Sequence, residues 1–296
     1  MINVIENKKY FLGFSATLVV ASLVLIAVFG FRQGIDLRGG TSWQITTHDK
    51  DANVALIKET ILSVENFAEV NVRSGEEGKF IIRLPDINEG VHQNILSAIM
   101  GEFDGVQEDS FSSIGPAIGS ELRRKSMWAI AIVLLAISAY IAWAFRKVSE
   151  PVKSWKYGVV TLITLLHDVS IPAGMMTLLG YLKGIEIDTN FIVALLVVMG
   201  FSVHDTIVVF DRIRENLILN RGKNRNLREI INFSVNETMA RSVNTSLTLI
   251  LVLVALIFAG PPSLLYFVLT MLVGTVFGTY SSIFVASPLL YLFQKK

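Results

Sequence analysis

The sequence predicts an α-helical membrane protein with six transmembrane helices and one small inserted α+β domain. Hydrophobic residues make up 52% of the 296 residues and charged residues only 17%, which is more apolar surface than a soluble chain of this length usually buries. Six apolar segments occur, and a polar stretch, residues 32–124, separates the first from the other five. The net charge of +1 gives no indication of nucleic-acid binding, and the absence of cysteine excludes disulfides and thiolate chemistry.

Each apolar segment is long enough to cross a bilayer, which takes about 20 residues in a helix. The first, residues 11–31, follows Lys8 and Lys9 and is longer than the apolar part of a signal peptide, so we interpret it as an uncleaved anchor. The others lie at about residues 125–145, 158–181, 189–210, 243–260 and 264–293, with a bend expected at Pro288. The predicted domains are residues 1–31, 32–124 and 125–296, with a loop at 211–241.

Basic residues predict the orientation of the helices. They precede the first helix, occupy every second connection and end the chain, whereas the short opposite connections contain only Lys183. Because cytoplasmic loops carry the excess of lysine and arginine, both termini are expected in the cytoplasm and residues 32–124 outside the inner membrane of a bacterium. The residues that carry this prediction are Lys8, Lys9, Arg146, Lys147, Lys153, Lys156, Arg212, Arg214, Arg221, Lys223, Arg225, Arg228, Lys295 and Lys296.

The polar stretch has the pattern of a small domain of the order βαββαβ. "TSWQITT" alternates like a strand, "AEVNVRS" and "KFIIRLP" flank a "GEEG" turn, and "GVQEDSFSSI" predicts a last strand. "DKDANVALIKETILSV" and "NEGVHQNILSAIM" have helical spacing. This order predicts a ferredoxin-like fold. It contains no nucleotide-binding loop and no metal-ligand spacing.

A carboxylate inside the fourth apolar segment is the strongest functional signal. An aspartate at the centre of a transmembrane helix costs about 2.5–3.5 kcal/mol, so Asp205 predicts a functional site. Ser202 shares its helical face. Arg241 opens the next segment, with Thr245 on its face. If these helices are neighbours, Asp205 and Arg241 can form a switchable ion pair that couples a proton to motion, or a static pair that fixes the helix register.

Two His-Asp dipeptides lie in neighbouring predicted helices. His167 and Asp168 lie about 7 Å deeper than His204 and Asp205 when the helical rise is applied. A metal site is the alternative that histidine and carboxylate suggest. The depth difference, and the angle of about 100° between adjacent side chains, disfavour it. Two further patterns have ordinary structural interpretations. Gly274 and Gly278 form a G-x-x-x-G pattern for close helix packing, and residues 226–240 predict either a surface helix or the lead into the fifth span.

Five motifs together resemble one known family. They are "GIDLRGGT" at 34–41, "SSIGPAIGSEL" at 112–122, "LLHDV" at 165–169, "GFSVHDTIVVFDRIREN" at 200–216 and "GTYSSIFVASPLL" at 278–290. In this order they resemble the SecD/SecF family of protein-export membrane proteins. One inserted domain and six spans are similar to its SecF members rather than to fused SecD–SecF chains. The residues expected to have a structural role in these signatures are Gly34, Asp36, Gly39, Gly40, Gly115, Pro116 and Gly119.

The resemblance implies a fold and a mechanism. The helices are expected to form half of a transporter of the RND type, completed by a SecD-like subunit, beside the Sec channel. Ion flow would drive late export of unfolded preproteins, without enzyme activity, cofactor or resident metal. The ion is expected to be H⁺, with Na⁺ as the alternative, and Asp205 and Arg241 match the coupling residues. His204, Ser202, Asp168, His167 and Thr245 are expected along the ion path. His204 stands where the family usually has asparagine, and Phe201 where it has tyrosine. A translocon subunit without ion flux is the alternative function.

Overall fold

The computed structural model describes residues 2–49, 51–75, 78–146, 152–220 and 226–294. The chain divides into two compact units, one formed by Met1–Arg32 with Met127–Lys296 and the other by Gln33–Ser126. We call them the helical unit and the α+β unit. Some residues on which the sequence predictions depend lie outside the described ranges. They are the middle of the "GEEG" turn and Lys147, Arg221, Lys223, Arg225, Lys295 and Lys296.

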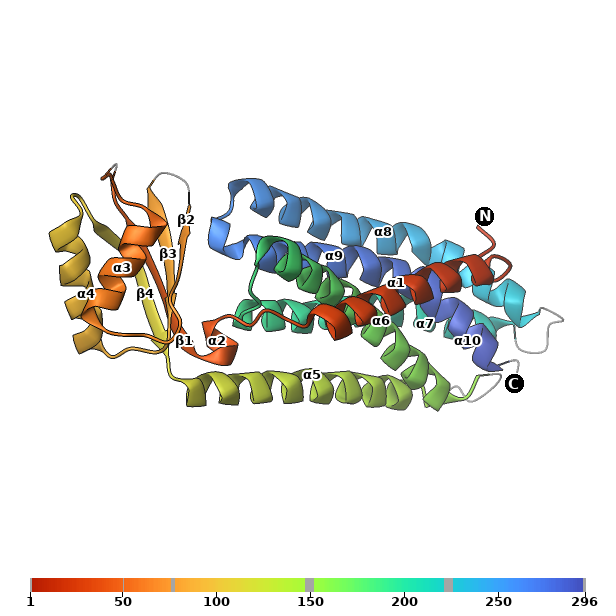
Figure 1. Cartoon of the computed structure of the whole chain (residues 1–296). Coiled ribbons are helices and arrows are strands. Elements are labelled where there is room, and N and C mark those ends of the chain that lie inside the picture. The colour runs from red at the N-terminus through yellow and green to blue at the C-terminus, as the bar shows by residue number, and fades with distance from the viewer. Residues whose placement is uncertain (1, 50, 76–77, 147–151, 221–225, 295–296) are drawn as a thin grey trace. The chain divides into compact units, whose positions relative to one another are not determined.

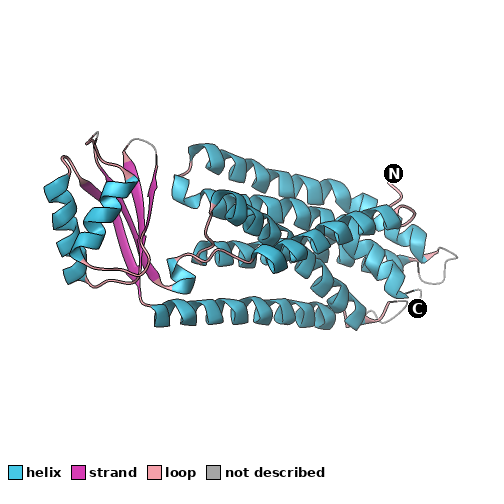
Figure 2. Cartoon of the chain, viewed as in Figure 1, coloured by secondary structure: helices cyan, strands magenta, loops and turns pink. Residues whose placement is uncertain are grey.

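The α+β unit has the predicted βαββαβ order (Figure 1). Its elements are β1 (Gly40–Thr46), α3 (Val54–Val64), β2 (Asn71–Ser74), β3 (Lys79–Leu84), α4 (Glu89–Glu102) and β4 (Gln107–Ile114). The sheet order is β2-β3-β1-β4 and each neighbouring pair is antiparallel. Figure 2 shows α3 and α4 together on one face of this sheet. The prediction of a ferredoxin-like domain is therefore confirmed.

Alternation along the strands builds the core of the α+β unit. Trp43 and Ile45 of β1 point toward the helices and are fully buried, as is Ile82 of β3, which pairs with Trp43. The helices contribute Ile57 and Ile95 to the same cluster. Each helix begins at an asparagine whose side chain accepts backbone N–H bonds of its first turn, Asn53 for α3 and Asn88 for α4. Periodicity and capping thus agree on the same boundaries.

The first two family-like signatures pack against each other within the α+β unit. A short helix, α2 (Ile35–Arg38), leads into Gly39 and Gly40, whose φ angles of 86° and 116° favour glycine. A Cβ on Gly39 would lie 2.6 Å from Cα of Pro116, and one on Gly119 would lie 2.5 Å from N of Gly39. Only glycine allows this approach of backbone to backbone. Of the other signature residues, Gly34 caps α2, Asp36 is in its first turn, and Gly115 precedes α5.

Six helical segments of the described residues are long and apolar enough to span a membrane, as predicted. They are α1 (Lys8–Phe29), α5 (Pro116–Ala144), α6 (Ser154–Lys183), α7 (Thr189–Leu219), α8 (Leu227–Ala259) and Pro262–Gln294. The last consists of η1 (Pro262–Leu264), α9 (Leu265–Ser281), η2 (Ser282–Ala286) and α10 (Ser287–Gln294). The chain begins and ends at the same end of the helical unit (Figure 1). The predicted connection at 211–241 is largely helical, because α7 and α8 extend into it from both sides.

Small residues bring the central helices α6, α7 and α9 into close contact. A Cβ on Gly174 of α6 would meet Ser22 of α1, and one on Gly274 of α9 would meet Val198 of α7. A Cβ on Gly278 would lie 3.1 Å from Cβ of Ser202. The G-x-x-x-G pattern in α9 therefore packs on α7, as expected for close helix packing. This contact places the middle of α7 against the end of α9.

The start of α8 belongs to the helical unit and is the lead into the fifth span rather than a separate surface helix. Its apolar face is buried, with Ile230, Ile231 and Val235 in the main cluster of the helical unit. The segment before α1 lies along it. Asn232 accepts a bond of 3.0 Å from N of Ile5, and Asn236 exchanges two bonds of 2.9 Å with the backbone of Ile2. Two asparagines one turn apart thus bind the start of the chain.

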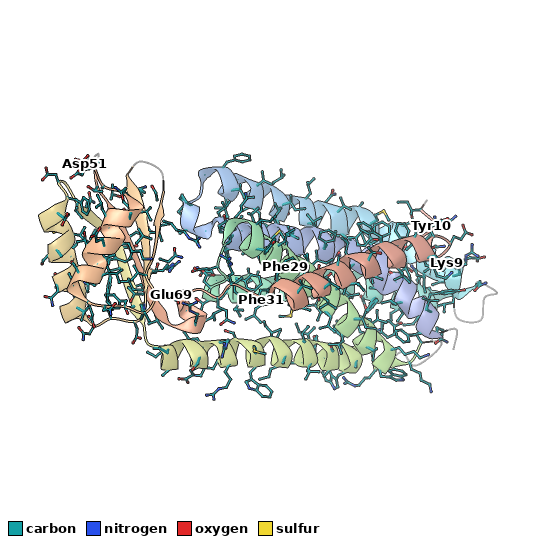
Figure 3. The ribbon with its side chains drawn as sticks, viewed as in Figure 1. Lys9, Tyr10, Phe29, Phe31, Asp51 and Glu69 are labelled. Carbon is teal, nitrogen blue, oxygen red and sulfur yellow. The ribbon has the colours of Figure 1, made fainter. Side chains whose placement is uncertain are left out.

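Aromatic side chains mark both ends of α1 (Figure 3). Lys9 and Tyr10 are exposed at its start, and Phe29 and Phe31 lie at its other end. The ring of Phe29 lies 4.2 Å from that of Tyr181 at the end of α6. Aromatic residues are enriched where a transmembrane helix meets the bilayer surface. This distribution agrees with the span expected from the length of α1.

Candidate functional site

Two buried carboxylates occupy the centre of the helical unit, where α6, α7 and α9 meet. Asp168 of α6 is fully buried, and Asp205 of α7 is 5% exposed. Both lie in segments that are otherwise apolar, where an unsatisfied carboxylate is very unfavourable. Their hydrogen-bond partners therefore define the chemistry of the site.

Asp168 is held by three side chains from three helices. Its Oδ1 lies 2.8 Å from Nδ1 of His167, and its Oδ2 accepts a bond of 2.9 Å from Oγ of Ser281. Oγ of Ser202 donates a second bond to Oδ2. Pro172, four residues later in α6, has no N–H to donate to the carbonyl of Asp168. The surroundings of this carboxylate thus consist of hydroxyl groups and an imidazole.

Asp205 has a different partner, which belongs to η2, the turn that continues α9. Its Oδ2 accepts a hydrogen bond from Oγ of Ser282, the residue after Ser281. On α7, Ser202 is three residues before Asp205, so the two side chains lie about one turn apart on one face. Consequently two consecutive serines, the last residue of α9 and the first of η2, bind the two carboxylates, and α7 contributes one donor and one carboxylate to the same region.

The serine pair lies where α9 changes to a π-helical turn. The turn η2 covers Ser282–Ala286 and ends just before Pro288. Proline cannot donate to the carbonyl four residues earlier and its ring collides with that carbonyl, so the extra residue of a π-turn relieves the conflict. The bend expected at Pro288 therefore occurs as this turn. Such turns are frequent at functional sites.

Three of the predicted site residues lie outside this centre. His204, Arg241 and Thr245 are exposed in the single chain. His204 and Arg241 have no hydrogen bond or ion pair to any described residue, and the expected pair of Asp205 with Arg241 is not formed. The reason is rotational. Ser242 and Ser246 are the buried side chains of this part of α8, and Arg241 and Thr245 each precede one of them by about 100°.

The α7–α8 contact instead contains charged and hydroxyl groups nearer the ends of the helices. Arg212 donates two bonds, of 2.7 and 2.6 Å, to the carboxylate of Glu237. Asn216 donates 2.8 Å and 3.0 Å bonds to Glu237 and Ser234. This network joins α7 to α8 away from Asp205. Closer to the site, Thr279 of α9 donates a bond of 2.5 Å to Ser246.

Ser281 and Ser282 occur in one of the family-like motifs, but the sequence did not indicate them as site residues. In the structure, the hydroxyl group of each donates a hydrogen bond to a buried carboxylate. The available signal was a serine pair seven and six residues before a proline in an apolar helix. The metal alternative finds no support in the described ranges, which contain no group of three or more His, Cys, Asp or Glu side chains that could hold a metal ion.

Six membrane-spanning helices with polar groups at their centre and a ferredoxin-like insertion between the first two define one half of an RND-type transporter. The family model described as "Protein export membrane protein SecD/SecF, C-terminal" matches residues 95–296, and "SecD/SecF GG Motif" matches residues 24–48. The chain belongs to the SecD/SecF family, among its SecF members.

Relatives support this assignment along the whole chain. Protein translocase subunit SecF of Thermobaculum terrenum is 40% identical over 100% of this chain and 95% of its own length. Protein translocase subunit SecDF of Thermus thermophilus is 34% identical over 95% of this chain. A crystal structure of SecDF from that genus, described as a translocon-associated membrane protein, has a TM-score of 0.83 and 32% identity over 100% of this chain. This chain spans only 37% of the fused sequence and 39% of the fused structure.

Proposed function

We propose that the chain is an accessory subunit of the Sec translocon that, with a SecD-like partner, couples ion flow to late export of preproteins. The observation that carries the coupling is the pair of buried carboxylates with their own hydroxyl donors inside three packed helices. Four side chains, His167, Ser202, Ser281 and Ser282, bind these two carboxylates and connect the three helical segments at this point.

A SecD-like partner is supported by the fused relatives and by the polar face of α8. In the fused protein of Thermus thermophilus this chain matches about a third of the length, which leaves room for a second half. Arg241, Asn244 and Thr245 are exposed where the apolar segment 243–260 begins. Because lipid does not satisfy such groups, the partner would cover them, together with His204 of α7.

Coupling requires that the ion change an interaction between helices. Arg241 stays charged, whereas Asp205 can bind and release a proton. In the described conformation Asp205 is bound to Ser282, and in another it would pair with Arg241. A membrane potential of 100 mV supplies about 2.3 kcal/mol per charge moved, enough for one or two protons to shift an equilibrium of a few kcal/mol. The imidazole partner of Asp168 can itself carry a proton, which favours H⁺. Na⁺ is the alternative, because hydroxyl and carboxylate oxygens are also ligands of hard cations.

The remaining parts follow from the orientation proposed for an inner membrane. With both termini in the cytoplasm, the α+β unit is outside, where an unfolded preprotein leaves the Sec channel. The α+β unit would bind the preprotein weakly and without sequence preference. Because α1 and α5 connect this unit to the other helices, it would move when they move. The helical unit would contact the lipid bilayer through its exposed apolar faces.

The test is Asp205→Asn in the complex with the SecD-like subunit, reconstituted in proteoliposomes. Proton flux is measured with a pH gradient and a pH dye inside the proteoliposomes. In parallel, the variant is added to membranes that lack their own SecF, and preprotein export is measured. We expect both to fall by about tenfold or more. Asp211→Asn is the matched control, because Asp211 is an exposed carboxylate of the same helix. Full export with Asp205→Asn would instead support a structural subunit without ion flux. A Na⁺ gradient at constant pH distinguishes the two ions.

A further inference from the structure

The His167–Asp168 pair has properties that fixing helix register does not require. Asp168 is fully buried and accepts bonds from two serines, and His167 is only 4% exposed. Nδ1 of His167 is 2.8 Å from Oδ1 of Asp168. Nε2 of the same ring is buried and has no hydrogen-bond partner among the described residues. An imidazole with one nitrogen on a carboxylate and the other unpaired can pass on a proton.

The ring of His167 lies beside a second group of polar atoms, which belong to α1 and α9. The ring of Tyr280 is nearly parallel to that of His167, with 6.5 Å between their centroids. The hydroxyl of Tyr280 donates to the carbonyl of Phe11 of α1 at 3.1 Å. Oγ of Ser15, also on α1, is buried close to the hydroxyl of Tyr280. Polar atoms in such a place are the usual partners of a buried water, which could bring a proton to Nε2.

On its other side, Asp168 is connected to Asp205 by shared helices. Ser281, the last residue of α9, donates to Asp168, and Ser282, the first residue of η2, donates to Asp205, so consecutive residues bind the two carboxylates. Ser202 donates to Asp168 from the turn of α7 that precedes Asp205. A hydroxyl stabilises an ionised carboxylate more than a neutral one. When one carboxylate gains a proton, its serine is therefore free to reorient toward the other.

We propose that His167 and Asp168 form a second proton-binding station, and that Ser281 and Ser282 couple its ionisation to that of Asp205. A proton reaches Nε2 of His167 and gives imidazolium. The Nδ1 proton then moves to Oδ1 of Asp168, which leaves a neutral carboxylic acid and a neutral imidazole that carries its proton on Nε2. Each step moves one proton and changes no other bond. The titratable side chains that neighbour this station are Tyr280 on α9 and Asp205 on α7.

This inference rests on the proposed function, but an infrared titration tests it without any ion flux. The full chain, purified with its SecD-like partner, is titrated while the C=O band of protonated carboxyl groups is recorded, and Asp168→Asn identifies the band of Asp168. We expect Asp205→Asn to move the midpoint of that band by about one pH unit or more. In Ser281→Ala and Ser282→Ala the effect of Asp205→Asn should be reduced. Ser287→Ala is the control, because it removes a buried hydroxyl of the next helix that contacts neither carboxylate in the described structure.

Proton flux in proteoliposomes gives the second measurement. We expect His167→Ala to reduce flux by about tenfold or more, and added imidazole to restore part of it. Rescue by imidazole distinguishes a proton carrier from a packing residue. The station would be overturned if both His167→Ala and Asp168→Asn kept wild-type flux. It would also be overturned if Asp205→Asn left the titration midpoint of the Asp168 band unchanged. If Asp168→Asn fails to fold, His167→Ala and Ser281→Ala carry the test. If Asp205→Asn conducts normally while the titrations remain coupled, the proposed function fails and the station stands.

Discussion

Gly119, at the start of α5, lies directly against the backbone of Gly39. A Cβ on Gly119 would lie 2.5 Å from N of Gly39 and 2.9 Å from the carbonyl carbon of Arg38. Gly39 is itself fixed by a positive φ of 86°. The two signatures that the sequence places far apart are therefore one structural joint, through which β1 and α5 are held together within the α+β unit. The role of this joint is to let the two backbone segments approach each other closely, and it has no chemical role.

Gly119→Ala should open this joint. The new methyl group would meet backbone atoms, which cannot adopt another rotamer as a side chain can. The overpacking is therefore expected to lower the free energy of unfolding by about 1–3 kcal/mol. Hydrogen exchange across β1 and the first turn of α5 measures the effect. Gly101→Ala is the control, because Gly101 lies in α4 with no atom within 4 Å of its Cβ position, and alanine there should slow exchange slightly. Unchanged exchange in Gly119→Ala would contradict the joint.

Gly274→Ala should separate α9 from α7 and so weaken the bond between Ser282 and Asp205. The two atoms nearest to the new methyl group are the Cγ atoms of Val198, so the double variant Gly274→Ala with Val198→Ala should recover part of the loss. We expect the single variant to lose about 1–3 kcal/mol of stability, measured as a lower midpoint of thermal unfolding in detergent. Gly200→Ala of α7, whose Cβ position is open, should have little effect. Failure of Val198→Ala to compensate would show that the two helices do not meet here.

A carboxylate in the α+β unit predicts a pH dependence. Oδ1 of Asp49 accepts from N of Asp51 at 2.9 Å and Oδ2 from N of Asp104 at 3.0 Å. These backbone bonds, the one from Asp51 first, lower the pKa of Asp49 below its ordinary value. The stabilisation is therefore complete above the unfolded pKa, about 3.9, and is lost as the pH falls through the lower folded pKa.

Asp49→Asn should remove this acid-dependent part of stability. Between pH 6 and pH 3 the wild-type loop around Asp104 should exchange its amide hydrogens faster as the pH falls, after correction for intrinsic rates, and the variant should show a smaller change. Asp51→Asn is the matched control, because it changes a neighbouring carboxylate and keeps the backbone donor. An equal pH dependence in wild type and Asp49→Asn would exclude the two backbone bonds as its source.

Apolar length and strand alternation were sufficient to predict the spans and the α+β order, because each depends on local sequence. The rotation of α8 was not predictable, since it has polar residues on two sides, Arg241 and Thr245 on the exposed one and Ser242 and Ser246 on the buried one. This is why Arg241 was expected beside Asp205. The serine ligands were missed for a related reason. Ser282 and Ser281 are 77 and 113 residues from the carboxylates that they bind, so only the packing of α9 on α6 and α7 reveals their role.

The exposed polar face of α8 predicts where a partner binds. Because the chain has no cysteine, a single cysteine at Asn244 is a unique label. In membranes with the SecD-like subunit, Asn244→Cys should react slowly with a water-soluble maleimide and form a crosslink to a cysteine of the partner. Phe258→Cys is the control, because Phe258 is 86% exposed at the other end of α8 and should not crosslink.

The physical reason is that an amide, a hydroxyl and a guanidinium in the apolar region are stable only beside polar groups or water. If Asn244→Cys reacts equally fast with and without the partner, the face opens to water instead. The pairing of Arg241 with Asp205 would then have to occur within this chain, by rotation of α8 alone. If the crosslink at Asn244→Cys disappears when Arg241→Ala is added, the arginine helps to bind the partner. The interface would then be connected through Arg241 to the buried carboxylates.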